Sequence, residues 1–202
     1  MAIARQDITG LVLAGGQGSR MGGVDKGLQP FRGQPLALHA LRRLQAQTGA
    51  VLLSANRNLA AYEAFGVHVW RDDEGGEGPL AGFLAGLMHC HTPWLLTVPC
   101  DTPFFPADLA ARLAAAAHRD DADIALAAAP DGDLQPVFCL LRASLRDELA
   151  AHLRQGGRKV RAWMGQHRCA TVRFDQPGDD PNAFANANTL AELRVLEGPI
   201  VP

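Results

Sequence analysis

The sequence predicts an α/β fold in three layers, with a mostly parallel sheet between two layers of helices. Short apolar runs alternate along the chain with longer segments of helical spacing, which is typical of parallel sheets covered on both faces. A glycine-rich loop follows the first apolar run, at the position where open α/β sheets bind ligands. A short Pro130-Asp131-Gly132 turn separates two later apolar runs and allows them to pair antiparallel, so we expect a mixed sheet.

The individual elements follow from local patterns. The run from Ile8 to Ala14 is apolar and short, as a buried parallel strand is. Leu38, Leu41 and Leu44 recur at helical spacing, and Gly78-Pro79 places a proline near the first position of a later helix. The expected strands are 8–14, 51–53, 67–70, 94–98, 123–129, 137–141 and 170–174. The expected helices are 34–47, 59–65, 78–90, 106–117, 144–155, 160–164 and 189–196.

The composition fits a single globular domain over residues 1–202. The hydrophobic content of 48% is too high for a disordered chain, and 202 residues can bury a core of useful size. The 19 basic and 21 acidic residues leave a net charge of −2, which predicts no bulk attraction to nucleic acid or to a membrane surface. An anionic ligand must therefore be held by a local site.

The cysteines and the N-terminal segment favour a cytoplasmic protein. Cys90, Cys100, Cys139 and Cys169 form no CxxC pair, so we expect reduced thiols rather than a zinc or disulfide framework. No apolar run reaches the roughly 18 residues that a membrane-spanning helix needs. The first apolar run breaks at Gly15, which is unlike a signal peptide.

The loop from Gly15 to Gly27 is the strongest functional signal. Glycines let backbone N–H groups turn toward a phosphate, and Arg20 and Lys26 add positive charge within the same loop. The loop is neither a Walker A motif nor a dinucleotide fingerprint, because it lacks GK[ST] and a third glycine in register. Lys26 is one of two lysines in an arginine-rich chain, which favours a position that needs a compact ammonium. A glycine-rich turn without a ligand is the alternative.

A second signal follows the apolar run from Leu95 to Val98. The run ends in Pro99-Cys100-Asp101-Thr102-Pro103, which places a carboxylate at the carboxyl end of a strand. A lone carboxylate there suits Mg²⁺, which takes one or two protein carboxylates together with substrate phosphates. The alternative is that Asp101 caps the following turn. No base lies near Cys100 in the sequence, so we expect this thiol to be buried and structural.

Together these signals resemble the molybdenum cofactor guanylyltransferase family over nearly the whole chain. The string from Arg20 to Lys26 is fairly specific, and combined with Asn186-Ala187-Asn188-Thr189 it is highly specific among nucleotidyltransferases. The resemblance implies a Rossmann-like sheet of the nucleotide-diphospho-sugar transferase type. The segments that match in family order are Leu13–Lys26, Gly33–Leu36, Ser54–Arg57, Gly78–Gly82, Pro99–Pro103 and Phe184–Thr189.

An enzyme of this family transfers GMP from GTP to the terminal phosphate of molybdopterin and releases pyrophosphate. The resemblance implies that the N-terminal half binds GTP, that the C-terminal half binds molybdopterin, and that Mg²⁺ is the metal. It also leaves molybdoenzyme-maturation proteins as candidate partners. Arg20, Lys26 and Asp101 are then the expected catalytic residues, with Asp101 as the metal ligand.

For GTP, the resemblance implies contacts from the glycine loop and from the ends of several strands. One departure concerns Ser54, where the family commonly has asparagine. The shorter hydroxyl can still donate a hydrogen bond, but its reach to the base is reduced. The expected GTP-binding residues are Leu13, Ala14, Gly15, Lys26, Ser54, Asp72 and Asp101.

For molybdopterin, the resemblance implies Asn186 and Asn188. These residues are two apart, so in an extended segment their side chains lie on the same face. Asn188 is also well placed to cap the helix expected near Thr189. Arg158 lies in a basic turn, 156–159, that meets either the pterin phosphate or solvent.

Two other functions remain open. A cytidylyltransferase would act on the same cofactor, but by resemblance those enzymes carry Leu-Ala-Ala-Gly where this chain has Leu13-Ala14-Gly15-Gly16. A glycine at position 15 leaves more room for a purine. A non-catalytic delivery protein would keep the fold and hold the cofactor, but it has no need of both Lys26 and Asp101.

Overall fold

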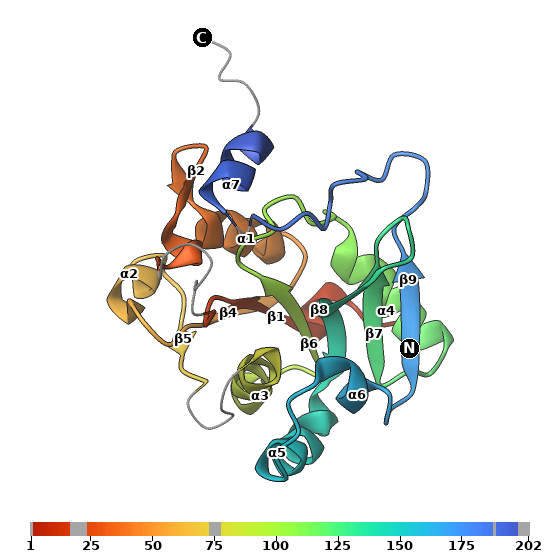
Figure 1. Ribbon diagram of the computed structural model, residues 1–202. Helices are drawn as coiled ribbons and strands as arrows, with labels where there is room; N and C mark the ends of the chain where they lie inside the picture. Colours follow the sequence, from red (N-terminus) through yellow and green to blue (C-terminus); the bar gives the residue numbers. More distant parts are fainter. Residues whose placement is uncertain (1, 17–23, 73–77, 188, 198–202) are drawn as a thin grey trace.

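The structure is a computed structural model that describes residues 2–16, 24–72, 78–187 and 189–197. It confirms the α/β class: one seven-stranded mixed sheet, in the order β5-β4-β1-β6-β8-β7-β9, lies between two layers of helices (Figure 1). The strands are β1 (Ile8–Leu13), β4 (Ala50–Ser54), β5 (Val69–Trp70), β6 (Trp94–Pro99), β7 (Ile124–Ala128), β8 (Leu134–Arg142) and β9 (Cys169–Arg173).

One strand makes the sheet mixed. β8 runs antiparallel to both of its neighbours, β6 and β7, whereas the other adjacent strands pair in parallel. The expected turn at Pro130-Asp131-Gly132 joins β7 to β8, and Gly132 adopts a positive φ of 91° there. A short turn of this kind requires an antiparallel return. β8 also pairs with β6, so it lies inside the sheet rather than at its edge.

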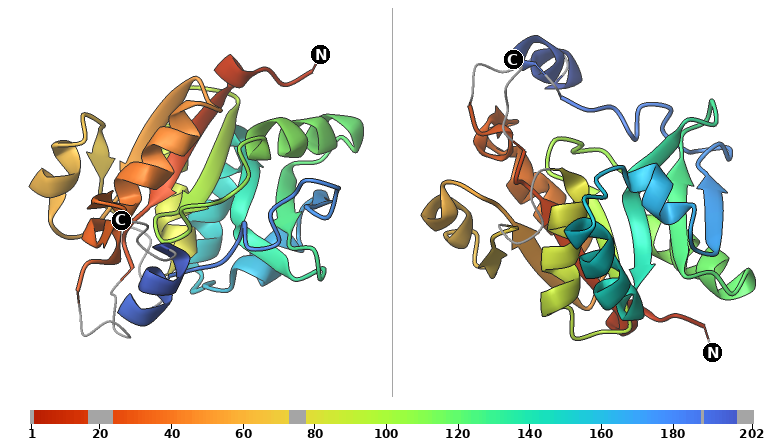
Figure 2. Two further views of the ribbon diagram at one scale, coloured as in Figure 1. Left: turned by 90° about the horizontal axis from the view of Figure 1, so that it is seen from above. Right: turned by 60° about the horizontal axis from the view of Figure 1, so that its bottom comes forward.

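The helices cover both faces of the sheet (Figure 2). On one face, α1 and α4 pack over β1, β4 and β7–β9, and on the other face α3 packs over β1, β4 and β6 and against α5. α2 lies beside the edge strand β5, and α7 lies beside a small hairpin formed by β2 (Pro30–Phe31) and β3 (Gln34–Pro35) (Figure 1). The helices are α1 (Leu36–Gln45), α2 (Leu59–Glu63), α3 (Pro79–His89), α4 (Leu109–Arg119), α5 (Arg146–Arg154), α6 (Val160–Met164) and α7 (Leu190–Glu197).

The segment after the glycine loop differs from the helix expected from residue 34. Gln34–Pro35 forms β3, which pairs antiparallel with β2 (Pro30–Phe31), so α1 begins at Leu36. Arg32 and Gly33 make the turn between them with φ values of 47° and 77°. Two residues per strand are too few for a period-two pattern to show in the sequence.

The core explains why the central strands read as continuous apolar runs. β1 is buried on both faces: Val12 packs in the layer beneath α1 and α4, and Leu11 packs in the layer beneath α3 and α5. α3 approaches the sheet closely at Gly86, where a Cβ would lie 2.5 Å from Leu11 Cδ2 and 2.9 Å from Leu95 Cδ2. Among the described residues, no helix has both the length and the apolar character needed to cross a membrane.

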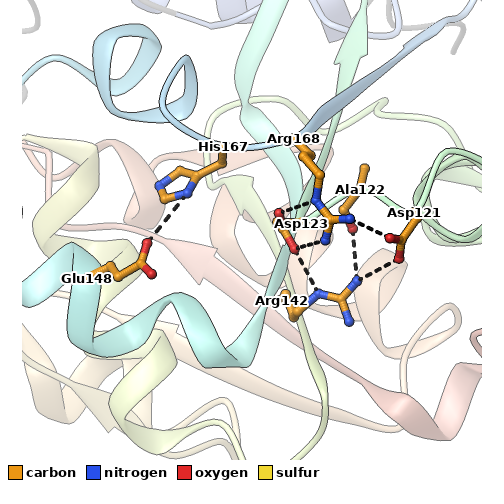
Figure 3. A network of polar contacts seen from close by, with 7 residues as sticks. All are labelled: Asp121, Ala122, Asp123, Arg142, Glu148, His167 and Arg168. Atoms are coloured by element: carbon orange, nitrogen blue, oxygen red, sulfur yellow. Dashed lines mark hydrogen bonds and ion pairs between the residues drawn. The ribbon is translucent and has the colours of Figure 1, made fainter.

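A network of charged side chains joins β7, β8 and β9 at the amino ends of the parallel strands (Figure 3). Asp123 accepts two hydrogen bonds of 2.9 Å from Arg168, and Arg142 Nε lies 3.2 Å from the same carboxylate. Asp121 accepts a further short hydrogen bond from Arg168, and Arg142 donates to the Ala122 carbonyl at 3.2 Å. The network fixes the relative positions of three neighbouring strands far along the sheet from Asp101.

We expect Asp123→Asn to lower the free energy of unfolding at neutral pH by about 1–2 kcal/mol, because charge-assisted hydrogen bonds to Arg168 are lost. Those hydrogen bonds hold the pKa of Asp123 below its usual range. Its contribution is therefore present above the unfolded-state pKa and disappears as pH falls through the lower folded-state value. Urea denaturation at several pH values tests this: the deficit of the variant should fade toward strong acid.

Asp147→Asn is the control, because its exposed pair with Arg146 should contribute little. A deficit of the Asp123 variant that persists unchanged in strong acid would contradict this interpretation.

Candidate functional site

The carboxyl ends of three parallel strands lie side by side and bring the two sequence signals together. Leu13, the last residue of β1, is in register with Ser54 of β4 and with Pro99 of β6. The ladder continues beyond the strands, because Ala14 N donates to Ser54 O at 2.7 Å and Cys100 N donates to Leu13 O at 3.0 Å. The glycine loop and the Asp101 segment therefore leave the sheet next to each other.

Lys26 and Asp101 form an ion pair across this edge. Lys26 Nζ lies 3.2 Å from Asp101 Oδ2, and the two side chains are 18% and 16% exposed. Both charges therefore remain within reach of a ligand while most of each side chain is covered. Beside them, burial is the main cause that raises the pKa of the Cys100 thiol, and the Asp101 and Asp25 carboxylates raise it further. Cys100 is thus a protonated structural thiol, as expected.

Gly15 lies against Asp72, which follows β5. A Cβ at Gly15 would be 2.9 Å from Asp72 Oδ2 and 3.3 Å from Asn56 Nδ2. Asn56 in turn accepts a hydrogen bond of 3.2 Å from the Asp72 backbone N–H through its side-chain oxygen. The space that the glycine leaves therefore faces the carboxylate of Asp72, a residue whose backbone is held by Asn56. This contact, rather than room for a base alone, gives a physical reason for glycine at position 15.

Asp72 also lines a cavity of about 440 Å³ between β5 and α3. The cavity wall is mostly aliphatic, with Arg71 and His89 among its polar members. Such a wall beside a carboxylate suits a flat, largely apolar ligand group that carries hydrogen-bond donors.

Ser54 lies behind this carboxylate. The residue is fully buried, and its hydroxyl has no hydrogen-bond partner among the described residues. A Cβ at Gly82 of α3 would lie 3.6 Å from Ser54 Oγ and 3.8 Å from Asp72 Oδ2, so both groups meet the first turns of α3. The side-chain amide that lies next to Asp72 therefore comes from Asn56, two residues after Ser54, and not from position 54.

Arg57 holds both ends of the glycine loop. Its Nη2 donates to Gly16 O at 3.3 Å and to Val24 O at 2.9 Å. Residues 17–23 between these ends, including the expected catalytic Arg20, lie outside the described residues. The sequence offered Arg57 only as part of a matching segment, without a role. Nothing in its local pattern shows that it reaches the loop, because the contact depends on how β4 aligns with β1.

The expected molybdopterin residue Asn186 lies next to the Asp101 segment. Asn186 Oδ1 accepts a hydrogen bond of 2.5 Å from Thr102 Oγ1, and Ala187 N donates to Asp101 O at 2.9 Å. Asn188 lies outside the described residues. The late asparagine motif is thus tied directly to the loop that carries Asp101.

Arg158 lies in the turn after α5. Its Nη1 donates to Leu153 O at 2.8 Å, in the last turn of that helix, and to Gly157 O at 2.7 Å, in the turn itself. These contacts give Arg158 a structural role as a C-terminal cap.

Comparisons with known proteins agree with this site. Residues 10–172 match the model of the MobA-like NTP transferase domain. The chain is 66% identical to a molybdenum cofactor guanylyltransferase of Acidovorax ebreus, over 97% of this chain and 98% of that protein. A second relative with the same name, from Albidiferax ferrireducens, is 60% identical over 96% of this chain and 98% of that protein. The chain belongs to the molybdenum cofactor guanylyltransferase family. It is therefore a nucleotidyltransferase.

A solved structure extends the comparison to the fold of the family. The molybdopterin-guanine dinucleotide biosynthesis protein A of Archaeoglobus fulgidus superimposes with a TM-score of 0.78 at 20% identity. The match covers 94% of this chain and 96% of that chain. The three-layer arrangement is thus shared across a large distance in sequence.

We expect Gly15→Ala to weaken GTP binding at least about tenfold, about 1.4 kcal/mol, because the added methyl displaces the Asp72 carboxylate. Isothermal titration with GTP measures the effect. Gly16→Ala is the matched control, because a Cβ at Gly16 meets no described atom within 4 Å. Equal losses in the two variants would show that the contact with Asp72 is not what position 15 protects.

Proposed function

We propose that this chain transfers GMP from GTP to the terminal phosphate of molybdopterin, forming molybdopterin guanine dinucleotide and pyrophosphate. The observation that carries the proposal is the Lys26–Asp101 pair at the carboxyl edge of the sheet, beside the two ends of a glycine-rich loop. The names of relatives that are up to 66% identical over nearly the whole chain support it.

The reaction joins two phosphates, so its main difficulty is electrostatic. Negative charge must be neutralised on the α-phosphate and on the departing pyrophosphate, and no covalent intermediate with the protein is needed. In the proposal Lys26 contacts the phosphates, and Arg20 adds a second positive charge from the same loop. Leu13, Ala14 and Gly15 lead into that loop. Because the Ala14 N–H already donates to Ser54 O, Gly15 is the first of the three whose backbone N–H we propose to face the triphosphate.

Asp101 is the residue that we propose as the ligand of Mg²⁺. The described residues contain no group of three or more histidine, cysteine or acidic side chains arranged to hold a metal ion. A single carboxylate of limited exposure fits Mg²⁺, because this ion completes its shell with water and substrate phosphates. When bound, the ion would neutralise charge on the phosphate oxygens.

Asp72 is the residue that we propose for the choice of base. An ionised carboxylate only accepts hydrogen bonds, and the edge of guanine offers adjacent N–H donors. Cytosine places a donor next to an acceptor, so its acceptor atom would face a carboxylate oxygen, which is also an acceptor, and the two would repel each other. Alanine at position 15, as in the cytidylyltransferase pattern, would also move Asp72 away. Ser54 then acts behind Asp72 rather than directly on the base.

In the proposal the C-terminal half of the chain binds molybdopterin, with Asn186 and Asn188 as the expected contacts. Asn186 accepts a hydrogen bond from Thr102, so a pterin bound by this segment would lie close to Asp101. Arg158 stays a weaker candidate, because its described hydrogen bonds go to its own turn. We expect the product to pass to molybdoenzyme-maturation proteins.

Thermal unfolding with different nucleotides tests the proposal. In Mg²⁺, GTP should protect the protein more than CTP or ATP, and a ligand at a hundred times its Kd stabilises by about 2.7 kcal/mol. Asp72→Asn should remove most of the preference for GTP, because the amide presents a donor to the guanine donors. Stronger protection by CTP would favour the cytidylyltransferase. The absence of protection by any nucleotide would favour the delivery protein.

A further inference from the structure

We propose that Asp25 is a positioning residue whose buried carboxylate fixes the turn that presents Lys26 to Asp101. The sequence motif of the glycine loop does not by itself indicate a role for this side chain. The proposal concerns where Lys26 lies, and only its consequence for turnover rests on the proposed function.

Both oxygens of the Asp25 carboxylate are engaged, and the side chain is 5% exposed. Oδ1 accepts a hydrogen bond of 3.2 Å from the Gly27 backbone N–H and a short one from the Tyr62 hydroxyl. Oδ2 accepts one of 3.0 Å from Asn58 Nδ2, and Arg57 Nε lies 3.7 Å from the same oxygen. A buried carboxylate is costly without such partners, so this set of donors defines one location for the side chain.

The three side-chain partners, two hydrogen-bond donors and the Arg57 guanidinium, come from one short segment, residues 57–62, between β4 and the end of α2. α2 has five residues, which is too few for a helix that is stable without tertiary contacts. Asn58 precedes it in a left-handed conformation, with φ 52° and ψ 34°, which asparagine tolerates better than most residues. Tyr62 is fully buried, and burial first and the bond to Asp25 second raise the pKa of its hydroxyl, so it remains a donor.

The contacts of Asp25 fix the backbone on both sides of Lys26. Asp25 caps the turn Lys26–Leu28 through its bond to Gly27 N, and its carbonyl accepts a hydrogen bond of 3.0 Å from Gln29 Nε2. A Cβ at Gly27 would lie 2.4 Å from the Tyr62 hydroxyl, so glycine is required for the tyrosine to reach Asp25. Lys26 is held between these two anchored neighbours, and its ammonium extends to Asp101.

The described contacts of the Asp25 side chain are all with donors of the protein, so Asp25 acts through Lys26 rather than on a substrate. A residue that merely stabilised the fold would leave Lys26 in place once the protein is folded. The test therefore needs a direct report of the position of Lys26.

The position of Lys26 can be followed directly because the chain contains two lysines, Lys26 and Lys159. Reductive methylation with ¹³C-formaldehyde keeps their positive charge and gives each a separate methyl signal in NMR spectra. In the otherwise unchanged chain, Asp101→Asn should shift the Lys26 signal, because the carboxylate lies 3.2 Å from its nitrogen. In an Asp25→Asn background the same change should have little effect, because the ammonium no longer lies beside position 101. Lys159 is the internal control.

Kinetics give a second readout on the unmodified protein. We expect Asp25→Asn to lower kcat/KM for GTP about a hundredfold, the loss that a displacement of about 1 Å can cause. Asp179→Asn is the matched control, because Asp179 also accepts hydrogen bonds from an arginine and a backbone N–H, in the loop after β9. Its kcat/KM should stay close to that of the parent enzyme.

The outcomes separate this proposal from the proposed function. A Lys26 signal that still responds to Asp101→Asn in the Asp25→Asn background would overturn the positioning role, whatever the activity. A lost response with normal turnover would support the positioning role and contradict the catalytic part assigned to Lys26. If Asp25→Asn does not fold, Tyr62→Phe and Asn58→Ala keep the carboxylate and each remove one donor. A Lys26 signal that keeps its full response to Asp101→Asn in both would overturn the proposal, and a weakened response would support it.

Discussion

The ion pair between Lys26 and Asp101 is the interaction on which the rest of the site depends. It joins two loops that are 75 residues apart in the chain and that leave the sheet at neighbouring strands. Removing one partner of a partly buried pair leaves the other charge without compensation. The two partners are anchored independently. Asp25 and the segment around α2 hold the turn of Lys26, and the bond from Ala187 N holds the Asp101 backbone.

Close approach between backbone and side chain is the second constraint. Gly15 and Gly27 stand where a Cβ would meet the Asp72 carboxylate and the Tyr62 hydroxyl, respectively, and at Gly82 it would meet Leu13 Cδ2 at 2.5 Å. Glycine in a loop beside a strand is commonly attributed to phosphate binding alone. In this chain Gly15 and Gly27 also let a polar side chain from another element lie against the loop backbone, and Gly82 lets α3 pack closely against Leu13.

The sequence predicted the alternation of strands and helices because each long element has its own apolar period. The expected strand 94–98 is one residue shorter than β6, and the expected helix 160–164 has the same bounds as α6. The hairpin of β2 and β3 was not predictable, because two-residue strands carry no periodic signal in the sequence. The insertion of β8 between β6 and β7 depends on long-range pairing, which the turn at Gly132 does not specify.

The site was predictable where a motif carries the chemistry, and less so where contacts cross between elements. Lys26 and Asp101 were identified from a glycine-rich loop and a strand end, and the structure brings them together. Asp25 and Tyr62 were missed because their contact joins residues 37 apart that share no motif. The aspartate immediately before a functional lysine is the local sequence signal that could have indicated it.

Pyrophosphate release tests whether the Lys26–Asp101 pair serves guanylyl transfer to molybdopterin. With Mg²⁺ and GTP, the enzyme should release pyrophosphate only when molybdopterin is added, and CTP should replace GTP poorly. Asp101→Asn should keep the fold and lose several kcal/mol of transition-state stabilisation, at least about a hundredfold in rate. Release that does not need molybdopterin, or an Asp101→Asn rate within about threefold of the parent, roughly 0.7 kcal/mol, would show that the pair does not serve this reaction.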